Sequence, residues 1–285
     1  MAATLIDGKA LAARVREEVA ASVAQLDHVG VATVLVGDDP ASHVYISSKQ
    51  KMATAAGIEA RDHRIPADTT QADLLALIAE INDDDAVDGL LVQLPLPDHI
   101  DERTVIEAID PAKDIDGIHP FNAGRLLGGS PTLVPATPRG IMRMLEEYRI
   151  DPKGADAVVI GRSNIVGRPI AQLLLHANAT VTVCHSRTQD LARHTLAADI
   201  LVAAVGSLHL VRADMVKPGA TVIDVGMNRT SDGLFGDVDP AAAERAAFIT
   251  PVPGGVGPMT IAMVLQNTVT AARARRAKNL ANPAH

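Results

Sequence analysis

The chain has 285 residues, of which 47% are hydrophobic and 21% are charged, and this balance excludes a disordered or fibrous protein. Its formal net charge of −8 at pH 7 argues against general binding to nucleic acid. No apolar run is long enough to cross a bilayer, and the N-terminus lacks the apolar core of a signal sequence. We therefore expect a cytoplasmic protein without membrane contact, and the length predicts two α/β domains.

Strands and helices are predicted to alternate through the first half of the chain. Apolar spacing indicates a helix over 8–26, a strand over 31–36, and then a helix that begins after the turn at 37–40. A strand near 58–65, a helix near 71–81, a strand over 89–92 and a short helix near 103–109 follow. Such alternation predicts a mostly parallel sheet covered on both faces.

Three chemically useful side chains share one face of the predicted helix after the first strand. Ser42, Tyr45 and Lys49 are spaced i, i+3 and i+7. Gln93 directly follows another strand, so it is expected at the same edge of the sheet, where open α/β sheets bind ligands. A solvated lysine, a packed tyrosine and a glutamine that holds a loop are the alternatives.

The segment 111–120 has the composition of a loop and carries Asp114 and Asp116. Because the two aspartates flank one residue, they are expected to point in opposite directions and to make a poor metal site. One is predicted to bind a ligand and the other to stabilise the turn, and the pattern does not say which. An irregular stretch over 121–138 and a helix from Thr137 to about Tyr148 follow, and the domain boundary is expected along this helix.

The second half opens with a pattern typical of dinucleotide binding. A strand over 157–160, a glycine-bounded turn over 161–167, a helix over 168–176 and a strand over 179–184 form a βαβ unit. The glycine spacing differs from G-x-G-x-x-G, so a turn that only packs the helix on the strand is the alternative.

The end of the second strand of this unit indicates the cofactor. Residues 185–188 contain no carboxylate for a ribose hydroxyl, whereas Arg162, Ser186 and Arg187 could hold a 2′-phosphate. NADP is therefore predicted in preference to NAD.

The remaining chain is predicted to complete the second domain. Strands are expected near 200–205, 221–225 and 248–250, followed by the rigid loop 251–258 and a helix over about 260–272. That loop either connects two elements or brings backbone close to a flat ligand. The basic run 273–278 is interpreted as cations at a helix end that lead into a frayed tail. Cys184 is the only cysteine, so no internal disulfide and no cysteine metal cluster is expected.

Six motifs in this order resemble the bifunctional methylenetetrahydrofolate dehydrogenase/cyclohydrolase family. They are Ile6–Lys9, Ser42-x-x-Tyr45-x-x-x-Lys49, Val92–Pro97, Lys113–Gly117, Gly161–Pro169 and Thr250–Thr260.

The resemblance implies NADP-dependent oxidation of 5,10-methylenetetrahydrofolate to the 5,10-methenyl compound, then its hydrolysis to 10-formyltetrahydrofolate, a one-carbon donor in purine biosynthesis. It implies a homodimer of chains with a folate-binding catalytic domain (1–139 and 260–285) and a Rossmann-type NADP-binding domain (140–259). Lys49 is the expected main catalytic residue, with Gln93 as its partner and Tyr45 as a ring that stacks on the folate.

Further roles are implied in the same way, with no metal. Asp116 is expected to bind the pterin. The expected substrate-binding residues are Ser42, Tyr45, Gln93, Leu94, Asp116, Pro253, Gly254 and Gly255, and the expected cofactor-binding residues are Gly161, Arg162, Ser163, Val166, Ser186, Arg187 and Met227. The alternatives are an NADP-dependent dehydrogenase of a small hydroxy acid and a non-catalytic NADP-binding scaffold.

Overall fold

The computed structural model describes residues 3–38 and 40–281, with side chains given outside 40–46 and 278–281. The chain forms two compact units, one of residues 1–13 and 135–263 and the other of residues 14–134 and 264–285. Helices α1 (Gly8–Val23) and α9 (Val256–Ala281) contribute residues to both units. These units differ from the expected domains at residues 1–13, 135–139 and 260–263. Residues 1–13 join the second half of the chain because β1 (Thr4–Leu5) pairs with β11 (Phe248–Ile249).

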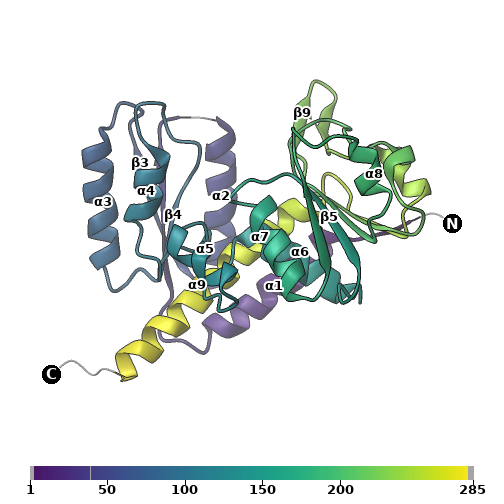
Figure 1. Ribbon diagram of the computed structural model, residues 1–285. Coiled ribbons are helices and arrows are strands. Elements are labelled where there is room, and N and C mark those ends of the chain that lie inside the picture. Colours follow the sequence, from purple (N-terminus) through teal and green to yellow (C-terminus); the bar gives the residue numbers. More distant parts are fainter. Residues whose placement is uncertain (1–2, 39, 282–285) are drawn as a thin grey trace. The chain divides into compact units, whose positions relative to one another are not determined.

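The unit of residues 14–134 and 264–285 is built on a three-stranded parallel sheet in the order β3-β2-β4. The central strand β2 (Gly30–Val36) is buried along its whole length, between β3 (Glu59–Ile65) and β4 (Gly89–Val92). Its alternate residues Ala32, Val34 and Val36 belong to a core that includes α3 (Gln71–Asp83) and α4 (Glu102–Ala108) (Figure 1). The predicted parallel sheet is thus confirmed in this unit.

The opposite face of β2 receives α2 (Pro40–Ala55), the helix that follows this strand. Thr33 points to this face, and its hydroxyl accepts a hydrogen bond from Gln50 Nε2 at 3.3 Å. Gln50 lies beside Lys49 on the helix, so this contact helps to fix the rotation of α2 on the sheet.

The other unit contains a six-stranded parallel sheet in the order β1-β11-β8-β7-β5-β6. The additional strands are β5 (Asp156–Ile160), β6 (Thr180–Cys184), β7 (Ile200–Ala203) and β8 (Thr221–Asp224), with helices α6 (Ala136–Glu147), α7 (Gly167–His176) and α8 (Leu191–Thr195) (Figure 1). Strand β5, helix α7 and strand β6 form the predicted βαβ unit, which the structure confirms.

Several elements differ from the sequence-based expectation. The stretch 121–138 is not wholly irregular, because it contains α5 (Pro120–Leu127), which begins at a proline and is capped by the His119 ring. An antiparallel hairpin of β9 (Asn228–Thr230) and β10 (Gly233–Phe235) and two 3₁₀ turns (Ala213–Met215 and Pro240–Glu244) were not predicted from the pattern. These elements are short, so they leave little periodic signal.

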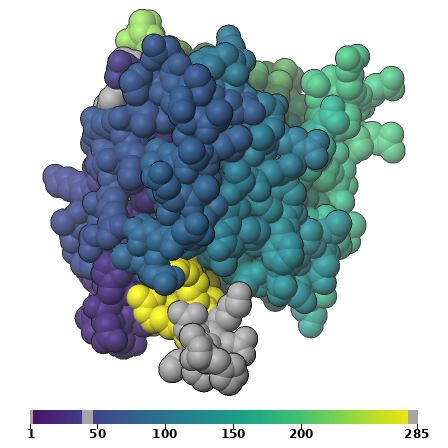
Figure 2. Space-filling model, turned by 90° about the vertical axis from the view of Figure 1, so that its left-hand side faces the viewer, coloured from purple at the N-terminus to yellow at the C-terminus, as the bar shows by residue number. Residues whose placement is uncertain are grey.

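The basic run near the C-terminus is an anchor, which corrects its interpretation as the start of a frayed tail. Arg275 and Arg276 lie within α9 and donate to the carboxylate of Asp88 at 3.2 and 3.1 Å. Asp88 is only 2% exposed and also accepts from Gly30 N–H. Arg276 additionally donates to the His28 carbonyl. In the space-filling view, yellow residues of α9 are seen next to purple and blue residues (Figure 2).

We predict that Asp88→Ala lowers the free energy of unfolding by about 3 kcal/mol, because it leaves two partly buried guanidinium groups without their shared carboxylate. Urea unfolding followed by circular dichroism measures this change. Asp85→Ala is the matched control, since Asp85 also pairs with Arg275 but its side chain is 97% exposed, and its loss is expected to cost about 0.5 kcal/mol or less. Equal effects of the two substitutions would contradict the anchoring role of Asp88.

Candidate active site

Lys49 is buried on the inner side of α2, with 6% of its surface exposed. Its Nζ donates to Gln93 Oε1 at 3.5 Å. The structure therefore excludes the alternative of a solvated lysine and brings together the amine and the amide that the sequence placed at one edge of the sheet. Ser42 and Tyr45 lie on the same helix, but their side chains are outside the described part of the structure, so their shared face remains a prediction.

Gln93 is held in one orientation by its own backbone surroundings. Its N–H donates to the Val34 carbonyl at 2.9 Å, which extends the sheet beyond the end of β4. Its side-chain Nε2 donates to the Leu94 carbonyl at 2.7 Å, and this bond turns the amide oxygen toward Lys49. Leu94 is half-buried and precedes Pro95 through a cis peptide bond. Gln93 thus both holds its loop and faces the amine.

The environment of Lys49 favours the neutral amine. Burial lowers the pKa of Lys49 below its ordinary value of 10.5, and the nearby negative charge of Asp116 partly opposes this effect. A buried amine with a lowered pKa can accept a proton near neutral pH more readily than an exposed lysine can.

The structure assigns the two loop aspartates different environments. Asp114 is buried and accepts from the N–H groups of Gly117 and His119 and from Asn122 Nδ2. Asp116 is half-buried and close enough to Lys49 to influence its pKa. The turn is therefore stabilised by Asp114, which leaves Asp116 as the candidate for ligand binding.

Two buried residues that sequence reasoning missed fix the loop around Asp116. Lys113 Nζ donates to the carbonyls of Ile81, Asn82 and Asp84 at the end of α3, at 2.9, 2.6 and 2.8 Å. Asn267 Nδ2, on α9, donates to the Ile115 carbonyl at 2.7 Å. The Lys113–Gly117 motif contained a signal for the first residue, whereas the second lies 152 positions away from its partner and left none.

The glycine turn after β5 fits a phosphate group. A Cβ on Gly167 would lie 2.3 Å from the Gly161 carbonyl oxygen, and Gly161 has a φ of +117°, so both positions require glycine. Ser163 Oγ accepts from the N–H groups of Val166 and Gly167 at the start of α7. Arg162 and Ser163 are exposed at this helix N-terminus, where backbone donors and the helix dipole favour an anion.

The loop after β6 fits a 2′-phosphate better than a bare ribose. Ser186 and Arg187 are exposed there. His185 holds the turn: its ring Nδ1 accepts from the Arg187 backbone N–H, and its backbone N–H donates to Thr188 Oγ1. An exposed guanidinium and a hydroxyl without a neighbouring carboxylate are suited to a phosphate monoester. The residues present therefore fit NADP.

The remaining candidate residues lie in two loops of the same unit. Met227 is exposed in the loop after β8. Gly254 has a φ of +109°, and its carbonyl accepts from the Lys9 N–H at 2.9 Å. A Cβ on Gly8 would lie 1.9 Å from the Gly255 carbonyl oxygen, which explains why glycine occurs in the first motif. Pro253 is exposed and follows a cis peptide bond.

Two buried carboxylates that the sequence did not single out, those of Asp224 and Asp237, lie next to the loop after β8. Asp224 is buried at the end of β8 and accepts from three backbone N–H groups, those of Gly226, Asp237 and Val238. Burial, with a smaller contribution from the charge of Asp237, raises the pKa of Asp224 to about 6 against the lowering effect of these donors.

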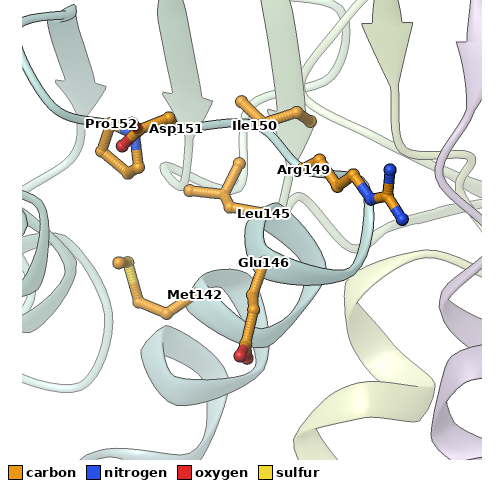
Figure 3. Close-up of a pocket in the computed structure, with 7 residues that line it drawn as sticks. All are labelled: Met142, Leu145, Glu146, Arg149, Ile150, Asp151 and Pro152. Carbon is orange, nitrogen blue, oxygen red and sulfur yellow. The ribbon is translucent and has the colours of Figure 1, made fainter.

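A pocket of about 380 Å³ lies elsewhere, between the end of α6 and the loop that leads to β5. In Figure 3, the charged ends of Glu146 and Arg149 point away from Leu145 and Pro152. No candidate residue lines it. Among the described residues, no group of three or more His, Cys, Asp or Glu side chains is arranged to hold a metal ion, and no helix is long and apolar enough to cross a membrane.

Comparison with known proteins assigns the chain to a family. Residues 6–116 match the model of the tetrahydrofolate dehydrogenase/cyclohydrolase catalytic domain, and residues 135–276 match that of the tetrahydrofolate dehydrogenase/cyclohydrolase NAD(P)-binding domain. The chain belongs to the tetrahydrofolate dehydrogenase/cyclohydrolase family.

The similarity to individual members of this family extends over nearly the whole chain. Bifunctional protein FolD of Acidiphilium cryptum is 61% identical over 279 residues, which cover 97% of this chain and 100% of that protein. The bifunctional FolD of Campylobacter jejuni has a crystal structure that superposes with a TM-score of 0.94 at 49% identity, covering 96% of this chain and 100% of that one.

A third family member was solved with its cofactor. The Trypanosoma brucei methylenetetrahydrofolate dehydrogenase-cyclohydrolase, complexed with NADP and an inhibitor, superposes with a TM-score of 0.91 at 39% identity, and the match covers 97% of this chain and 99% of that one. The predicted family, two-domain α/β fold and NADP-binding domain are thereby confirmed.

We predict that Asp224 makes stability fall as the pH rises. Its folded pKa of about 6 exceeds the unfolded value near 3.8, so between these values the folded state binds more protons than the unfolded state. Relative to Asp224→Asn, which does not titrate, the wild type is expected to lose about 2 kcal/mol between pH 4.5 and 7. Urea unfolding of both proteins across this range measures the difference, and a difference that is independent of pH would contradict the raised pKa.

Proposed function

We propose that the chain is a bifunctional enzyme that oxidises 5,10-methylenetetrahydrofolate with NADP to the 5,10-methenyl compound and then hydrolyses this compound to 10-formyltetrahydrofolate. The observation that carries the proposal is the buried Lys49 amine, hydrogen-bonded to Gln93 and close to Asp116, in a chain of this family.

The oxidation step requires that no positive charge faces the reacting carbon. NADP, when bound, supplies the hydride acceptor, and the one-carbon bridge becomes cationic as hydride leaves it. A charged ammonium beside this carbon would oppose that development of charge. A neutral Lys49, favoured by its burial, avoids the repulsion while its amine still contacts Gln93.

The hydrolysis step requires a base. We propose that neutral Lys49 accepts a proton from the water that attacks the methenyl carbon, and that Gln93 holds the amine in place for this transfer. The hydroxyl adduct then opens as its bond from carbon to N5 breaks: N5 takes the proton back from Lys49, and the hydroxyl releases its own proton to solvent as the formyl carbonyl forms. A single amine then serves both reactions, first by its lack of charge and then by its basicity.

Substrate binding is proposed to involve one face of the folate ring system and its polar edge. The Asp116 carboxylate can accept two parallel hydrogen bonds from the 2-amino group and a ring N–H of the pterin. Tyr45 is proposed to stack on the ring, with further contacts from Ser42, Leu94 and the loop of Pro253, Gly254 and Gly255. The unit of residues 14–134 and 264–285 thus supplies the catalytic residues.

The other unit is proposed to hold NADP. Its glycine turn and the start of α7 would bind the pyrophosphate through Gly161, Ser163 and Val166. Arg162, Ser186 and Arg187 would bind the 2′-phosphate, and Met227 would contact the cofactor from the loop after β8.

We also propose that the enzyme is a cytoplasmic homodimer whose product serves purine biosynthesis. Strand β6 is an edge strand of the six-stranded sheet, and Val183 on it is exposed, as are Leu175 and Leu196 on adjoining segments. Such an apolar edge is suited to pairing with a second copy, and light scattering in solution measures the resulting mass.

The reaction is tested by absorbance of the purified protein with 5,10-methylenetetrahydrofolate and either NADP or NAD, with reduced cofactor and methenyl compound followed separately. We expect reduction of NADP with little accumulation of the methenyl compound. A folded protein that reduces neither cofactor with this folate would point instead to a hydroxy-acid dehydrogenase or a non-catalytic NADP-binding scaffold.

We predict that Lys49→Met lowers the cyclohydrolase rate by about 100-fold or more while the fold is retained, because the apolar side chain fills the site but cannot accept a proton. Hydrolysis of added methenyltetrahydrofolate measures this rate, and circular dichroism checks the fold. Lys51→Met is the matched control, since Lys51 is exposed on the same helix. A full cyclohydrolase rate in Lys49→Met would contradict the proposed role of the amine.

A further inference from the structure

The buried carboxylates Asp224 and Asp237 lie where the segments that follow four strands meet. Asp224 ends β8 and is 4% exposed, and Asp237 follows β10 and is fully buried. Neither belongs to the residues assigned above to substrate or cofactor. Buried charges of this kind are retained only where hydrogen bonds compensate for their lost hydration.

Asp237 holds the loop that leaves the carboxyl end of β7. One of its oxygens accepts from the N–H groups of Val205 and Gly206, at 2.7 and 3.0 Å, and the other accepts from Ser207 N–H at 2.8 Å. This second oxygen also accepts from Nδ2 of Asn228, a residue in the segment after β8, at 3.0 Å. One carboxylate therefore fixes three consecutive peptide groups and links two loops.

Asp224 in turn holds the segment that carries Asp237. Its oxygens accept from Gly226 and Asp237 N–H at 2.9 Å each and from Val238 N–H at 3.0 Å. The N–H of Asp224 donates to Thr250 Oγ1 at 2.7 Å, beyond the end of β11. The pair thus ties together the segments after β7, β8, β10 and β11.

The space around the pair is closed to side chains. A Cβ on Gly236 would lie 1.7 Å from Asp224 Oδ2, and a Cβ on Gly226 would lie 2.4 Å from Asp237 Oδ1. The two glycines let the backbone donors approach the carboxylates closely, so the arrangement has little freedom to change.

The loops that Asp237 and Asp224 hold follow β7 and β8. They lie at the half of the sheet that is left for the nicotinamide end of the cofactor. The glycine turn lies after β5, and the phosphate-binding residues Ser186 and Arg187 lie after β6, on one side of β5 in the sheet. Strands β7 and β8 lie on the other side. Because a dinucleotide lies across the carboxyl ends of such a sheet, its second half extends over the loops after β7 and β8.

We propose that Asp237, supported by Asp224, is a positioning residue for the nicotinamide half of NADP. It acts by fixing the peptide groups of residues 205–207 and the segment around Met227, without touching the cofactor itself. This inference rests on the proposed function, and it deepens that function by naming what shapes the cofactor site.

Asp237→Asn tests the inference, because it keeps the shape of the side chain but turns one acceptor oxygen into a donor that faces backbone N–H groups. We expect the dissociation constant for NADP, measured by calorimetry, and the KM for NADP to rise by about tenfold or more. The KM for 5,10-methylenetetrahydrofolate and the cyclohydrolase rate, which needs no NADP, are expected to stay within about twofold.

Two further variants keep the test decisive. Asp199→Asn alters another carboxylate of the same sheet, at the amino end of β7, where it accepts from Asp156 N–H, and it is expected to leave NADP binding unchanged. Asn228→Ala removes one hydrogen bond to Asp237 but leaves both carboxylates, and it is expected to weaken NADP binding by a smaller factor. It replaces Asp237→Asn if that variant does not fold.

The inference is overturned if Asp237→Asn, or Asn228→Ala in its place, binds NADP as tightly as the wild type, or if cyclohydrolase activity falls together with NADP binding. A wild-type protein that binds NADP in this assay but converts no folate would count against the proposed function. The role of Asp237 would still be tested by the same binding measurement, and weaker NADP binding by the variant would support it.

Discussion

The burial of one amine constrains the rest of the candidate site. Lys49 can stay inside the protein only if its cost of burial is met, either by loss of its proton or by nearby acceptors. Gln93 provides an oxygen whose direction is fixed by the bond from its Nε2 to the Leu94 carbonyl, and Asp116 provides a negative charge at longer range. Burial outweighs the charge of Asp116 and lowers the pKa of Lys49, which is the property that both proposed reaction steps use.

Other buried charged groups serve the structure, and each makes several hydrogen bonds to loops or helices. Lys113 donates to three carbonyls at the end of α3, and Asp88 accepts from two arginines of α9. Asp237 accepts four hydrogen bonds, three of them from consecutive backbone N–H groups. These groups hold loops or helices in place, whereas the Lys49 amine, beside Gln93, is the buried charge for which we propose a chemical role.

The sequence predicted what depends on local pattern. The strands β2, β4, β5 and β6 follow from apolar runs with clear ends, and Lys49 and Gln93 were expected together because both follow strands of one parallel sheet. Pattern could not find α5, whose eight residues include a glycine, or the anchoring role of Arg275 and Arg276, whose partner Asp88 lies far away in the chain. Asp237 was missed for the same reason, since three of its four donors are about 30 residues distant and are backbone groups without a sequence signature.

The most direct test of this account is the titration of Lys49 itself. NMR of protein labelled with ¹³C at lysine Cε, with the Lys49 signal assigned from a variant that lacks it, reports the protonation of this amine as the pH is raised. If a neutral amine serves both steps, the midpoint lies so far below the ordinary pKa of 10.5 that a measurable fraction of the amine is neutral at the pH of the assay. A midpoint at or above that value would mean that Lys49 stays charged at neutral pH, and it would contradict the claim that one neutral amine serves both steps.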